Sequence, residues 1–439
     1  MRRVLTASFV VPLLVLAVAA GVRLWALGLP DRLVGDEVYY IHDARAYLVR
    51  LPPMDPSPDD PVHIDDEMSW MHPPMGKLLI AAGIALTGNI PVGWRVASAL
   101  FGIAAVWLVY QIGLSLWRSP WWAGLAGLLL ALDGLSIVQS RAGMLDVFVP
   151  TFILGAAYCL IRNQLDAPPL EVGWVERLFG SRWILGAGLC LGGAVATKWS
   201  GFYALGPAFL ISVVIAVRSA PTGWRERARA VLRIALGLIV VPAVVYLASY
   251  TELFVQHGPD PRTFIALQAA MVRFHAGLEV DHPQASRAQT WPVLAHPFMW
   301  YRLPDRDSPG PGWDAEVLGV GNPALWWGWL ALLPVLLWSV VWRRDIVGAL
   351  ILGAYLFMWV PWLFVPRTEY MYYMLPAVPF MALGSCAALR ALPGRWGTRV
   401  AVGLSTLTVV VAVAFMPMWL GLVVPASWLT DVHWLPGWI

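Results

Sequence analysis

Two adjacent carboxylates, Asp36 and Glu37, follow the first hydrophobic segment of the chain after a short polar stretch. Charged side chains this close to a lipid bilayer are costly unless water, cations or a substrate engage them. A carboxylate at a membrane surface can also act as a general base that takes a proton from an attacking hydroxyl. The pair therefore marks a candidate catalytic site.

Other charged residues lie near the ends of hydrophobic segments and are predicted to share the face of the bilayer that presents Asp36. Any one of them can be explained by a side chain that reaches the lipid headgroups. The group contains both signs, however, and cations at a bilayer surface suit a lipid phosphate. It predicts group transfer from a lipid phosphate to a polar acceptor, and its members are His72, Lys77, Arg95, Asp133, Arg141, Asp146, Lys198 and Arg367.

Lysine is rare in this chain. Lys77 and Lys198 are the only lysines among 30 basic residues, and both belong to the charged group. A compact ammonium suits contact with a phosphate, although two residues do not exclude chance. The run Asp65–Glu67 offers oxygen ligands for a divalent cation, but a solvated acidic loop is the commoner explanation.

Several other functions lack support in the sequence. The net charge of +3 gives no indication of nucleic-acid binding. The chain has neither a P-loop nor a dinucleotide-binding glycine motif, so a nucleotide-dependent reaction is unsupported. We expect no cofactor and no metal site, with a divalent-metal requirement left open.

The composition indicates what positions these residues. The chain is 59% hydrophobic and 13% charged, with a mean hydropathy of +0.65, whereas soluble domains contain about 25% charged residues. Apolar runs long enough to cross a bilayer predict an all-α membrane protein of about eleven spans. The predicted spans are 4–27, 91–117, 121–138, 144–162, 183–197, 201–217, 230–249, 323–342, 345–365, 369–389 and 400–424.

The arginines predict the orientation of these spans. With Arg2 and Arg3 inside, most arginines in the short loops also fall inside, as the positive-inside rule requires. Two long loops, 28–90 and 250–322, then lie outside. We therefore expect a plasma-membrane protein with a cytoplasmic N-terminus, a retained signal-anchor and an external active site.

Residues 77–88 predict a short helix at the interface, and residues 261–274 predict an amphipathic surface helix. The proline-rich stretch 52–61 argues against a helix there. We divide the chain into a core module with the first external loop (1–249), the second external loop (250–322) and a C-terminal four-helix membrane module (323–439).

Several motifs resemble those of the protein O-mannosyltransferases, in order and over nearly the whole chain. The resemblance is closest to the bacterial members, which lack a soluble sugar-binding-like domain. The motifs are GDEVYY (Gly35–Tyr40), HPPMGK (His72–Lys77), GWRVASALFG (Gly93–Gly102), LDG (Leu132–Gly134), SRAGMLD (Ser140–Asp146), TKWSG (Thr197–Gly201), FHAGL (Phe274–Leu278), GNPALWW (Gly321–Trp327) and YYMLP (Tyr372–Pro376).

The resemblance implies a GT-C glycosyltransferase fold and transfer of mannose from a polyprenyl phosphate to Ser or Thr of a protein, with inversion at the anomeric carbon. It implies that Asp36 is the general base and that Glu37 orients the acceptor or supports the loop. Arg95 matches the arginine near the donor phosphate. We infer from charge and topology that Arg141 and Lys198 assist it. His72, Lys77, Asp133, Asp146 and Arg367 would support the substrate site.

One departure from the family pattern concerns Gly35, where an aromatic residue is usual; this would widen or loosen the acceptor side. The partners we expect are the donor lipid, secreted or membrane protein acceptors, the bilayer and the secretion translocon. Two alternatives remain: another GT-C transfer to a lipid or glycan acceptor, and a transporter. A transporter would show inverted repeats and midplane polar residues, which are not evident here.

Overall fold

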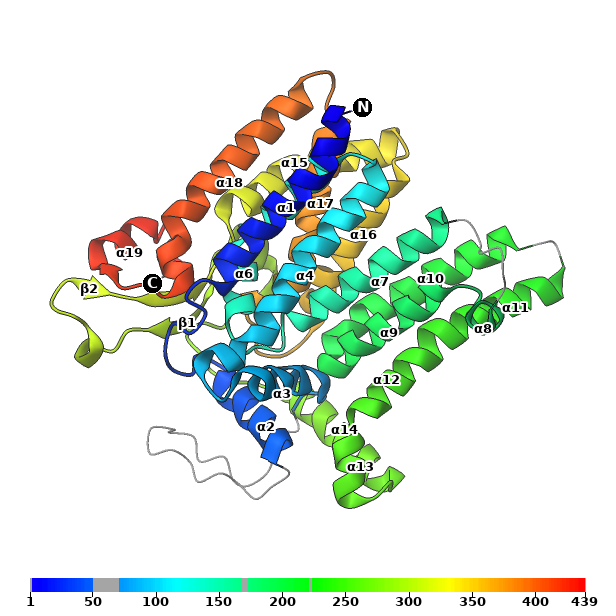
Figure 1. The fold of residues 1–439 in the computed structure, drawn as a ribbon, viewed down its shortest axis with the longest axis horizontal. Helices are drawn as coiled ribbons and strands as arrows, with labels where there is room; N and C mark the ends of the chain where they lie inside the picture. The colour runs from blue at the N-terminus through cyan, green and yellow to red at the C-terminus, as the bar shows by residue number, and fades with distance from the viewer. Residues whose placement is uncertain (1, 50–70, 167–172, 221–222, 439) are drawn as a thin grey trace. The chain divides into compact units, whose positions relative to one another are not determined.

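The computed structural model of the 439-residue chain describes residues 2–49, 71–166, 173–220 and 223–438 (Figure 1). The proline- and aspartate-rich stretch 50–70, including Asp65–Glu67, lies outside the described residues.

Apolar runs of sufficient length become helices, as the sequence predicts. The helices are α1 (Arg2–Leu24), α2 (Glu37–Val49), α3 (Met75–Thr87), α4 (Pro91–Trp117), α5 (Pro120–Ala131), α6 (Gly134–Arg141), α7 (Phe148–Leu165), α8 (Trp174–Phe179), α9 (Arg182–Thr197), α10 (Phe202–Ser219), α11 (Trp224–Ala235), α12 (Val241–Ser249), α13 (Thr251–His257), α14 (Pro261–Ala276), α15 (Pro323–Trp342), α16 (Ile346–Trp359), α17 (Val378–Ala391), α18 (Trp396–Leu420) and α19 (Ala426–Val432).

The structure confirms a multi-pass membrane architecture. Within the described residues, seven helical segments are long and apolar enough to span a membrane, or eight if α5 and α6 together form one span. The predicted count of about eleven is not confirmed, because apolar segments such as Phe9–Leu24 and Arg182–Thr197 are shorter than a full span. The predicted interfacial and amphipathic helices are present as α3 and α14.

The predicted span 121–138 is not one straight helix. The axes of α5 and α6 differ by 61° at a break next to Asp133. The side chain of Asp133 accepts a hydrogen bond from the N–H of Ser136, so it caps the new helix. A polar residue that competes for backbone N–H groups favours a helix start over a helix interior.

The chain forms two compact units. The first contains residues 1–69, 77–147 and 274–439, and the second contains residues 70–76 and 148–273. This division cuts across the modules 1–249, 250–322 and 323–439. The reason is that the C-terminal helices α17 and α18 pack against α5 and α6 from the first half of the chain.

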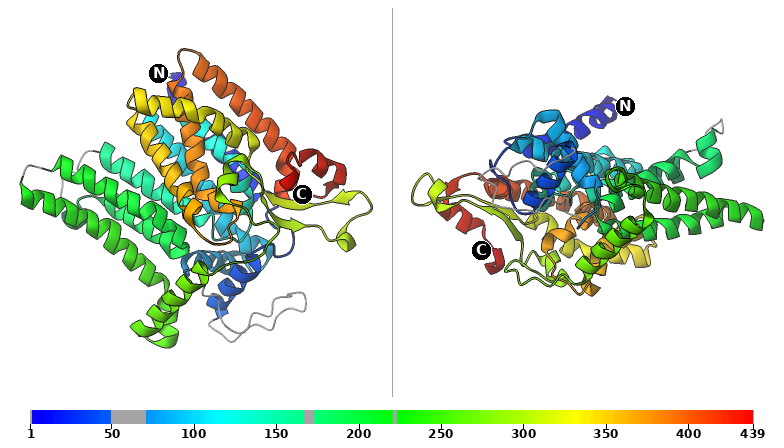
Figure 2. Two further views of the ribbon diagram at one scale, coloured as in Figure 1. Left: turned by 180° about the vertical axis from the view of Figure 1, so that it is seen from behind. Right: turned by 90° about the horizontal axis from the view of Figure 1, so that it is seen from below.

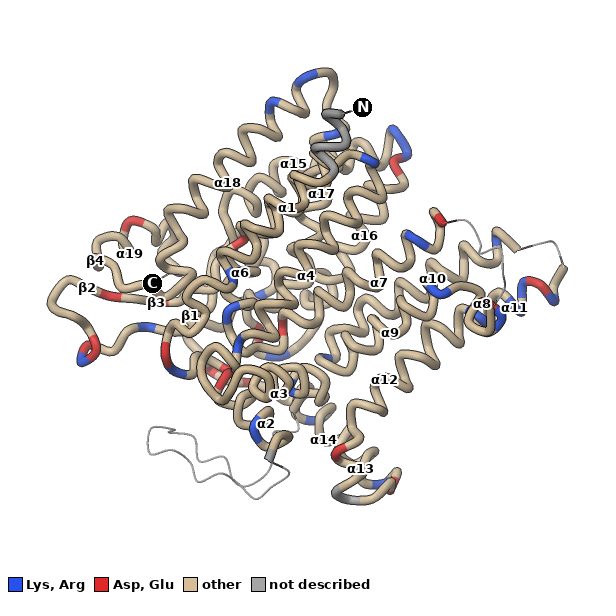
Figure 3. Tube along the Cα trace, viewed as in Figure 1, with Lys and Arg blue, Asp and Glu red and all other residues tan. Residues whose placement is uncertain are grey.

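Basic residues mark one end of the first unit (Figure 3). They gather where α15 ends and α18 begins, and Arg343, Arg344, Arg395 and Arg399 lie at those positions. The other end, near α2 and the strands, carries acidic and basic residues together (Figure 3). A cluster of arginines at one end of the helices is the pattern that the positive-inside rule describes for short loops on one side of a membrane.

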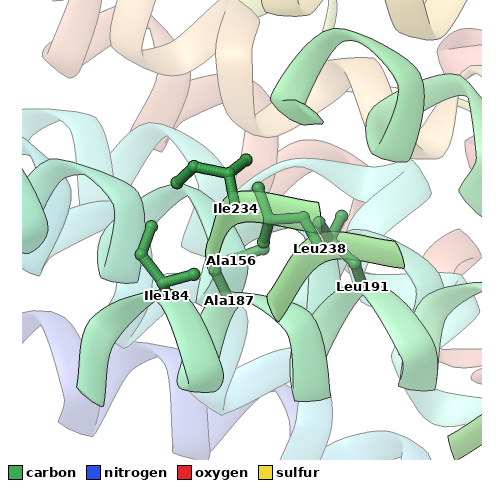
Figure 4. Packing of buried hydrophobic residues seen from close by; sticks show 6 residues of the cluster. All are labelled: Ala156, Ile184, Ala187, Leu191, Ile234 and Leu238. Atoms are coloured by element: carbon green, nitrogen blue, oxygen red, sulfur yellow. The ribbon is translucent and has the colours of Figure 1, made fainter. Parts of the chain in front are cut away.

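The core of the second unit is apolar (Figure 4). Its helices α7, α9 and α11 and a π-helical segment, Leu236–Val240, meet through small and branched side chains. The buried members of this cluster are Ala156, Ile184, Ala187, Leu191, Ile234 and Leu238.

Short strands in the loop 250–322 and after α18 were not predicted. Strand β1 (Phe298–Arg302) pairs antiparallel with β3 (Glu316–Gly319), and β2 (Trp313–Asp314) pairs with β4 (Val424–Pro425). Strand β3 packs on α6 and α18, and β2 packs against α19 (Figure 2). The strands therefore form an outer layer at the carboxyl end of α18.

Candidate active site

Asp36 lies at the amino end of α2. Its backbone oxygen accepts hydrogen bonds from the N–H groups of Tyr39 (3.1 Å) and Tyr40 (3.2 Å), so it begins the first helical turn. A helix N-terminus favours a negative charge. The side chain of Asp36 is partly exposed, whereas that of Glu37 is completely buried. The two adjacent carboxylates therefore occupy different environments.

Glu37 forms a buried ion pair with Arg95. The Nε of Arg95 donates to Glu37 Oε1 (2.8 Å) and its Nη2 donates to Oε2 (2.9 Å). The N–H groups of Val34 (2.9 Å) and Gly143 (2.6 Å) donate to the same carboxylate. Two-pronged pairing with additional N–H donors holds a buried charge in one geometry. Of the two predicted roles for Glu37, this geometry favours support of the loop.

The remaining N–H groups of Arg95 bind backbone oxygens of the loop before Asp36. They donate to Leu27 (3.3 Å), Pro30 (2.8 Å) and Arg32 (2.8 Å). A guanidinium has five N–H donors, and all five of Arg95 are directed at protein acceptors. The contacts thus differ from those predicted for a phosphate ligand, and they make Arg95 a positioning residue for the loop.

Arg141 has a related role at the end of α1. Its side chain binds two of the last carbonyl groups of that helix, which lack partners within a helix, and two carbonyl groups just beyond its end. A cation at this end also complements the helix dipole. The acceptors are the backbone oxygens of Val22 (3.3 Å), Arg23 (3.2 Å), Trp25 (2.7 Å) and Ala26 (2.8 Å).

Asp133 belongs to a separate network. Its Oδ2 accepts hydrogen bonds from the N–H of Asn322 (3.0 Å) and the indole of Trp326 (2.8 Å). Across the same helix break, the buried Arg23 donates to the backbone oxygen of Ala131 (3.1 Å). These contacts give Asp133 a structural role in the break between α5 and α6, away from the loop of Asp36.

Lys77 pairs with Asp43 and joins α3 to α2. The Lys77 Nζ lies 2.7 Å from Asp43 Oδ2, and both side chains are buried. Burial lowers the pKa of Lys77, while the charge of Asp43 acts in the opposite direction. Because α2 begins directly after Asp36, this pair helps to fix the helix that presents the carboxylate.

Asp36 interacts electrostatically with two tyrosines. Burial raises the pKa of Tyr40 well above its usual value, and the charges of Asp36 and then Asp146 raise it further. Burial and the charge of Asp36 also raise the pKa of Tyr370. The charge of Asp36 therefore acts on both tyrosines.

Arg367 supplies a cation to this group. Its Nη2 donates to the hydroxyl of Tyr373 (3.1 Å), and its Nη1 lies 2.8 Å from Nδ1 of His275. The side chain is partly exposed. The first unit thus brings together Asp36, Asp146 and Arg367 beside a group of tyrosines. We call this group the tyrosine wall, and its members are Tyr40, Tyr370, Tyr372 and Tyr373.

Lys198 and His72 belong to the second unit. Lys198 lies between α9 and a 3₁₀ turn, Trp199–Gly201, and is partly buried. The neighbouring Trp199 donates to the hydroxyl of Tyr246 (3.0 Å), which donates to Gln268 on α14 (2.6 Å). The phosphate-binding role of Lys198 and the supporting role of His72 stay predictions.

Sequence reasoning missed four residues at this site. Asp43 pairs with Lys77, Tyr370 is influenced by the charge of Asp36, and Trp300 contacts Gly35. Glu369 is a buried carboxylate beside Tyr370. Burial raises the pKa of Glu369 to about 7. The tyrosine-rich run 370–373 was the available signal, whereas isolated residues in long loops gave none. Among the described residues, no group of three or more His, Cys, Asp or Glu side chains is placed to hold a metal ion.

The fold is shared with solved membrane glycosyltransferases. The Saccharomyces cerevisiae protein O-mannosyltransferase Pmt1-Pmt2 complex bound to the sugar donor matches with a TM-score of 0.80 at 14% identity, covering 98% of this chain and 92% of that chain. ArnT from Cupriavidus metallidurans bound to undecaprenyl phosphate matches with a TM-score of 0.61 at 19% identity, covering 92% and 69%. The chain therefore has the GT-C glycosyltransferase fold.

Sequence comparison identifies the family. Residues 13–255 match the family described as dolichyl-phosphate-mannose-protein mannosyltransferase, and residues 261–438 match the C-terminal four-TMM region of protein-O-mannosyltransferase. The chain is 34% identical over 422 residues to the polyprenol-phosphate-mannose–protein mannosyltransferase of Mycolicibacterium smegmatis, with 84% of this chain and 82% of the relative covered. The corresponding protein of Mycobacterium tuberculosis is 32% identical over 424 residues, with 84% and 81% covered. This chain belongs to the protein O-mannosyltransferase family.

Proposed function

We propose that this protein transfers mannose from polyprenyl-phosphate mannose to serine and threonine hydroxyls of proteins. The reaction takes place at the outer face of the plasma membrane and inverts the anomeric carbon. Family membership supports the reaction class, and the relatives from Mycolicibacterium smegmatis and Mycobacterium tuberculosis are named for the same donor and for protein acceptors.

The different environments of the two adjacent carboxylates support the assignment of Asp36 as the base. Glu37 is fully buried and engaged by Arg95, whereas Asp36 is partly exposed among tyrosines. Asp36 takes the proton from the acceptor hydroxyl while that oxygen forms a bond to the anomeric carbon. The bond from this carbon to the phosphate oxygen breaks, and the polyprenyl phosphate leaves with the electron pair. One base and a phosphate leaving group suffice for this inversion.

The donor phosphate needs positive charge, because negative charge grows on it in the transition state. Lys198 remains the predicted ligand for this phosphate. Arg141 keeps N–H donors beyond those bonded to α1, and Arg367 is a partly exposed cation beside Tyr373. Arg95 acts on the reaction indirectly, by holding the loop that carries Asp36.

The outward orientation also belongs to the proposal, together with acceptors that emerge from the secretion translocon. Impermeant thiol labelling of Ala285→Cys, an exposed position in the second external loop, should succeed in intact cells. Ser219→Cys, an exposed position at the end of α10, should label only after lysis. The reverse pattern would refute the orientation.

Transfer itself is tested with purified protein in lipid nanodiscs, radiolabelled polyprenyl-phosphate mannose and a Ser/Thr-rich peptide. Wild-type protein should label the peptide, and Asp36→Asn should lower turnover by about 10²–10⁴-fold. Asp31→Asn, an exposed carboxylate in the same loop, is the matched control and should keep normal turnover. Label that enters only a lipid or glycan acceptor would overturn the protein-acceptor assignment.

A further inference from the structure

Gly35, the residue before Asp36, is in direct contact with an aromatic ring. Its φ angle is +48°, in the left-handed region that residues other than glycine rarely adopt. A Cβ added to Gly35 would overlap Cε3 and Cζ3 of Trp300. The indole of Trp300 therefore occupies the space that a side chain at position 35 would need.

A β-bulge aims Trp300 at this position. Met299 pairs with Leu318 and Tyr301 pairs with Val317, so Trp300 is an extra residue between consecutive pairs. A bulge bends its strand and redirects a side chain, and bulges occur often beside active sites. The partner strand β3 is buried along its whole length and packs on α6 and α18. The ring is thus held on a rigid support.

Trp300 also joins the loop of Asp36 to the tyrosine wall. It is only 4% exposed. Its ring centroid lies 4.6 Å from that of Phe298 and 5.1 Å from that of Tyr372. Tyr372 stacks on Tyr370 at 5.6 Å, and the charge of Asp36 acts on Tyr370. The six-membered ring of the indole therefore meets Gly35, its five-membered ring lies beside Gly319, and Phe298 and Tyr372 are its aromatic neighbours.

We propose that Trp300 is a positioning residue for mannosyl transfer. Its ring limits how closely the loop approaches β1 and so fixes the direction of the Asp36 carboxylate toward the acceptor hydroxyl. The inference rests on the proposed function, with Asp36 as the base. Glu37 and Arg95 bind the backbone of the loop through hydrogen bonds, and Trp300 contacts the loop at Gly35.

The rate of proton transfer depends on the position of the base. A general base must lie within hydrogen-bond reach of the proton that it accepts. A misplacement of about 1 Å can cost about 10²-fold in rate. Trp300 touches the residue next to the base, so its removal should lower kcat more than it raises KM for the donor.

The test combines truncation with relief of a steric overlap. In the nanodisc assay, Trp300→Ala should lower kcat by about 10–100-fold with KM for the donor changed less than about threefold, whereas Trp300→Phe should recover most of the rate. Gly35→Ala should also lower kcat, because the new methyl group meets the ring. In the double variant Gly35→Ala/Trp300→Ala the overlap is gone and only the left-handed backbone of residue 35 opposes alanine, so the combined loss should be smaller than the product of the two single losses. Non-additivity of this kind reports direct coupling.

Trp313→Ala is the matched control, because Trp313 lies in the same outer layer, in β2, and is 48% exposed. It should keep normal kcat. Thermal unfolding of each variant provides the folded fraction. If Trp300→Ala does not fold, the two single variants Trp300→Phe and Gly35→Ala still test the contact. The role of Trp300 would be overturned if the losses multiply in the double variant or if Trp300→Ala keeps an unchanged kcat. In either case, activity of the wild-type protein would still support mannosyl transfer. A wild-type protein without transfer would overturn both.

Discussion

The two compact units are stabilised in different ways. The first unit contains buried charges, including Arg23, Glu37, Arg95 and Asp133, and each of these binds backbone atoms or polar side chains. The core of the second unit consists of alanine, leucine and isoleucine (Figure 4). Regular helices satisfy their own backbone groups, so the second unit needs only close packing. The first unit holds an irregular loop and a broken helix, whose backbone groups need other partners.

This difference teaches where charge is required in the fold. Arg95 and Arg141 together bind backbone oxygens from residue 22 to residue 32. These bonds satisfy polar backbone groups of an irregular segment, and each buried carbonyl group left without a partner would cost about 1–3 kcal/mol. Charges that resemble a substrate site by sequence thus serve largely to shape the chain that leads to Asp36.

The strongest test of the comparison removes the cation beneath the active loop. Arg95→Met leaves Glu37 buried without its partner, which should reduce the free energy of unfolding by about 3–5 kcal/mol. Mannosyl transfer per folded molecule should also fall, because the loop loses its backbone contacts. Thermal unfolding and turnover of purified variants measure both effects.

The double variant Glu37→Gln/Arg95→Met is the control, since it removes both charges and should be less destabilised than Arg95→Met. A stable Arg95→Met protein with weaker donor binding and an intact loop would instead favour the phosphate contact expected from the family pattern.

A smaller effect is expected at the helix break. Asp133→Asn replaces an oxygen acceptor by an amide donor, so the N–H of Asn322 or the indole of Trp326 loses its partner. Each unsatisfied buried donor should cost about 1–3 kcal/mol of unfolding free energy. Turnover of the folded fraction should stay within a few-fold of wild type, and a selective loss of turnover would show that Asp133 acts on the substrate.

The second unit should respond to volume rather than to charge. A Cβ at Gly188 on α9 would overlap the backbone oxygen of Gly237 in the π-helical segment. Gly188→Ala should therefore destabilise the protein by about 1–3 kcal/mol. Gly206→Ala on α10, where no neighbouring atom lies within 4 Å, should be neutral. Equal effects of the two substitutions would contradict close packing of α9 against this segment.

The smallest expected effect concerns Glu369. Burial raises the pKa of Glu369 from the usual 4.5 to about 7 in the folded protein. Between these values the folded state retains a proton that the unfolded state has lost, so stability falls as pH rises. Wild-type protein should lose thermal stability relative to Glu369→Gln between about pH 5 and 7. A difference that does not change with pH would rule out this titration.

The sequence predicted the helices because each apolar run is long enough to define one by itself. It also placed Asp36 and Glu37 near the start of the long loop 28–90, shortly after the first apolar segment. It did not predict that Glu37 is an internal ion-pair partner, because charge reveals nothing about which backbone oxygens converge on Arg95. The break at Asp133 was missed because the apolar run 121–138 continues across it, although the side chain of Asp133 caps α6 and also binds Asn322 far along the chain.

Trp300 illustrates the remaining difficulty. Its position depends on a bulge, on the pairing of β1 with β3, and on a glycine more than two hundred residues earlier in the chain. Sequence-based reasoning treated Gly35 as a widening of the acceptor side. The structure shows instead that the space beside Gly35 is filled by the ring of Trp300 from β1.

The pairing of β2 with β4 has a consequence for biosynthesis. Strand β4 and α19 follow the last long helix, and Glu316 of β3 binds His433 just beyond α19. The indole of Trp438 donates to the backbone oxygen of Leu294. These segments follow α18 in the chain, whereas their partners precede α15, so the contacts can form only after all the long helices have been synthesised. A nascent chain whose last residue lies in α18 would therefore have its membrane helices but not its finished layer of strands.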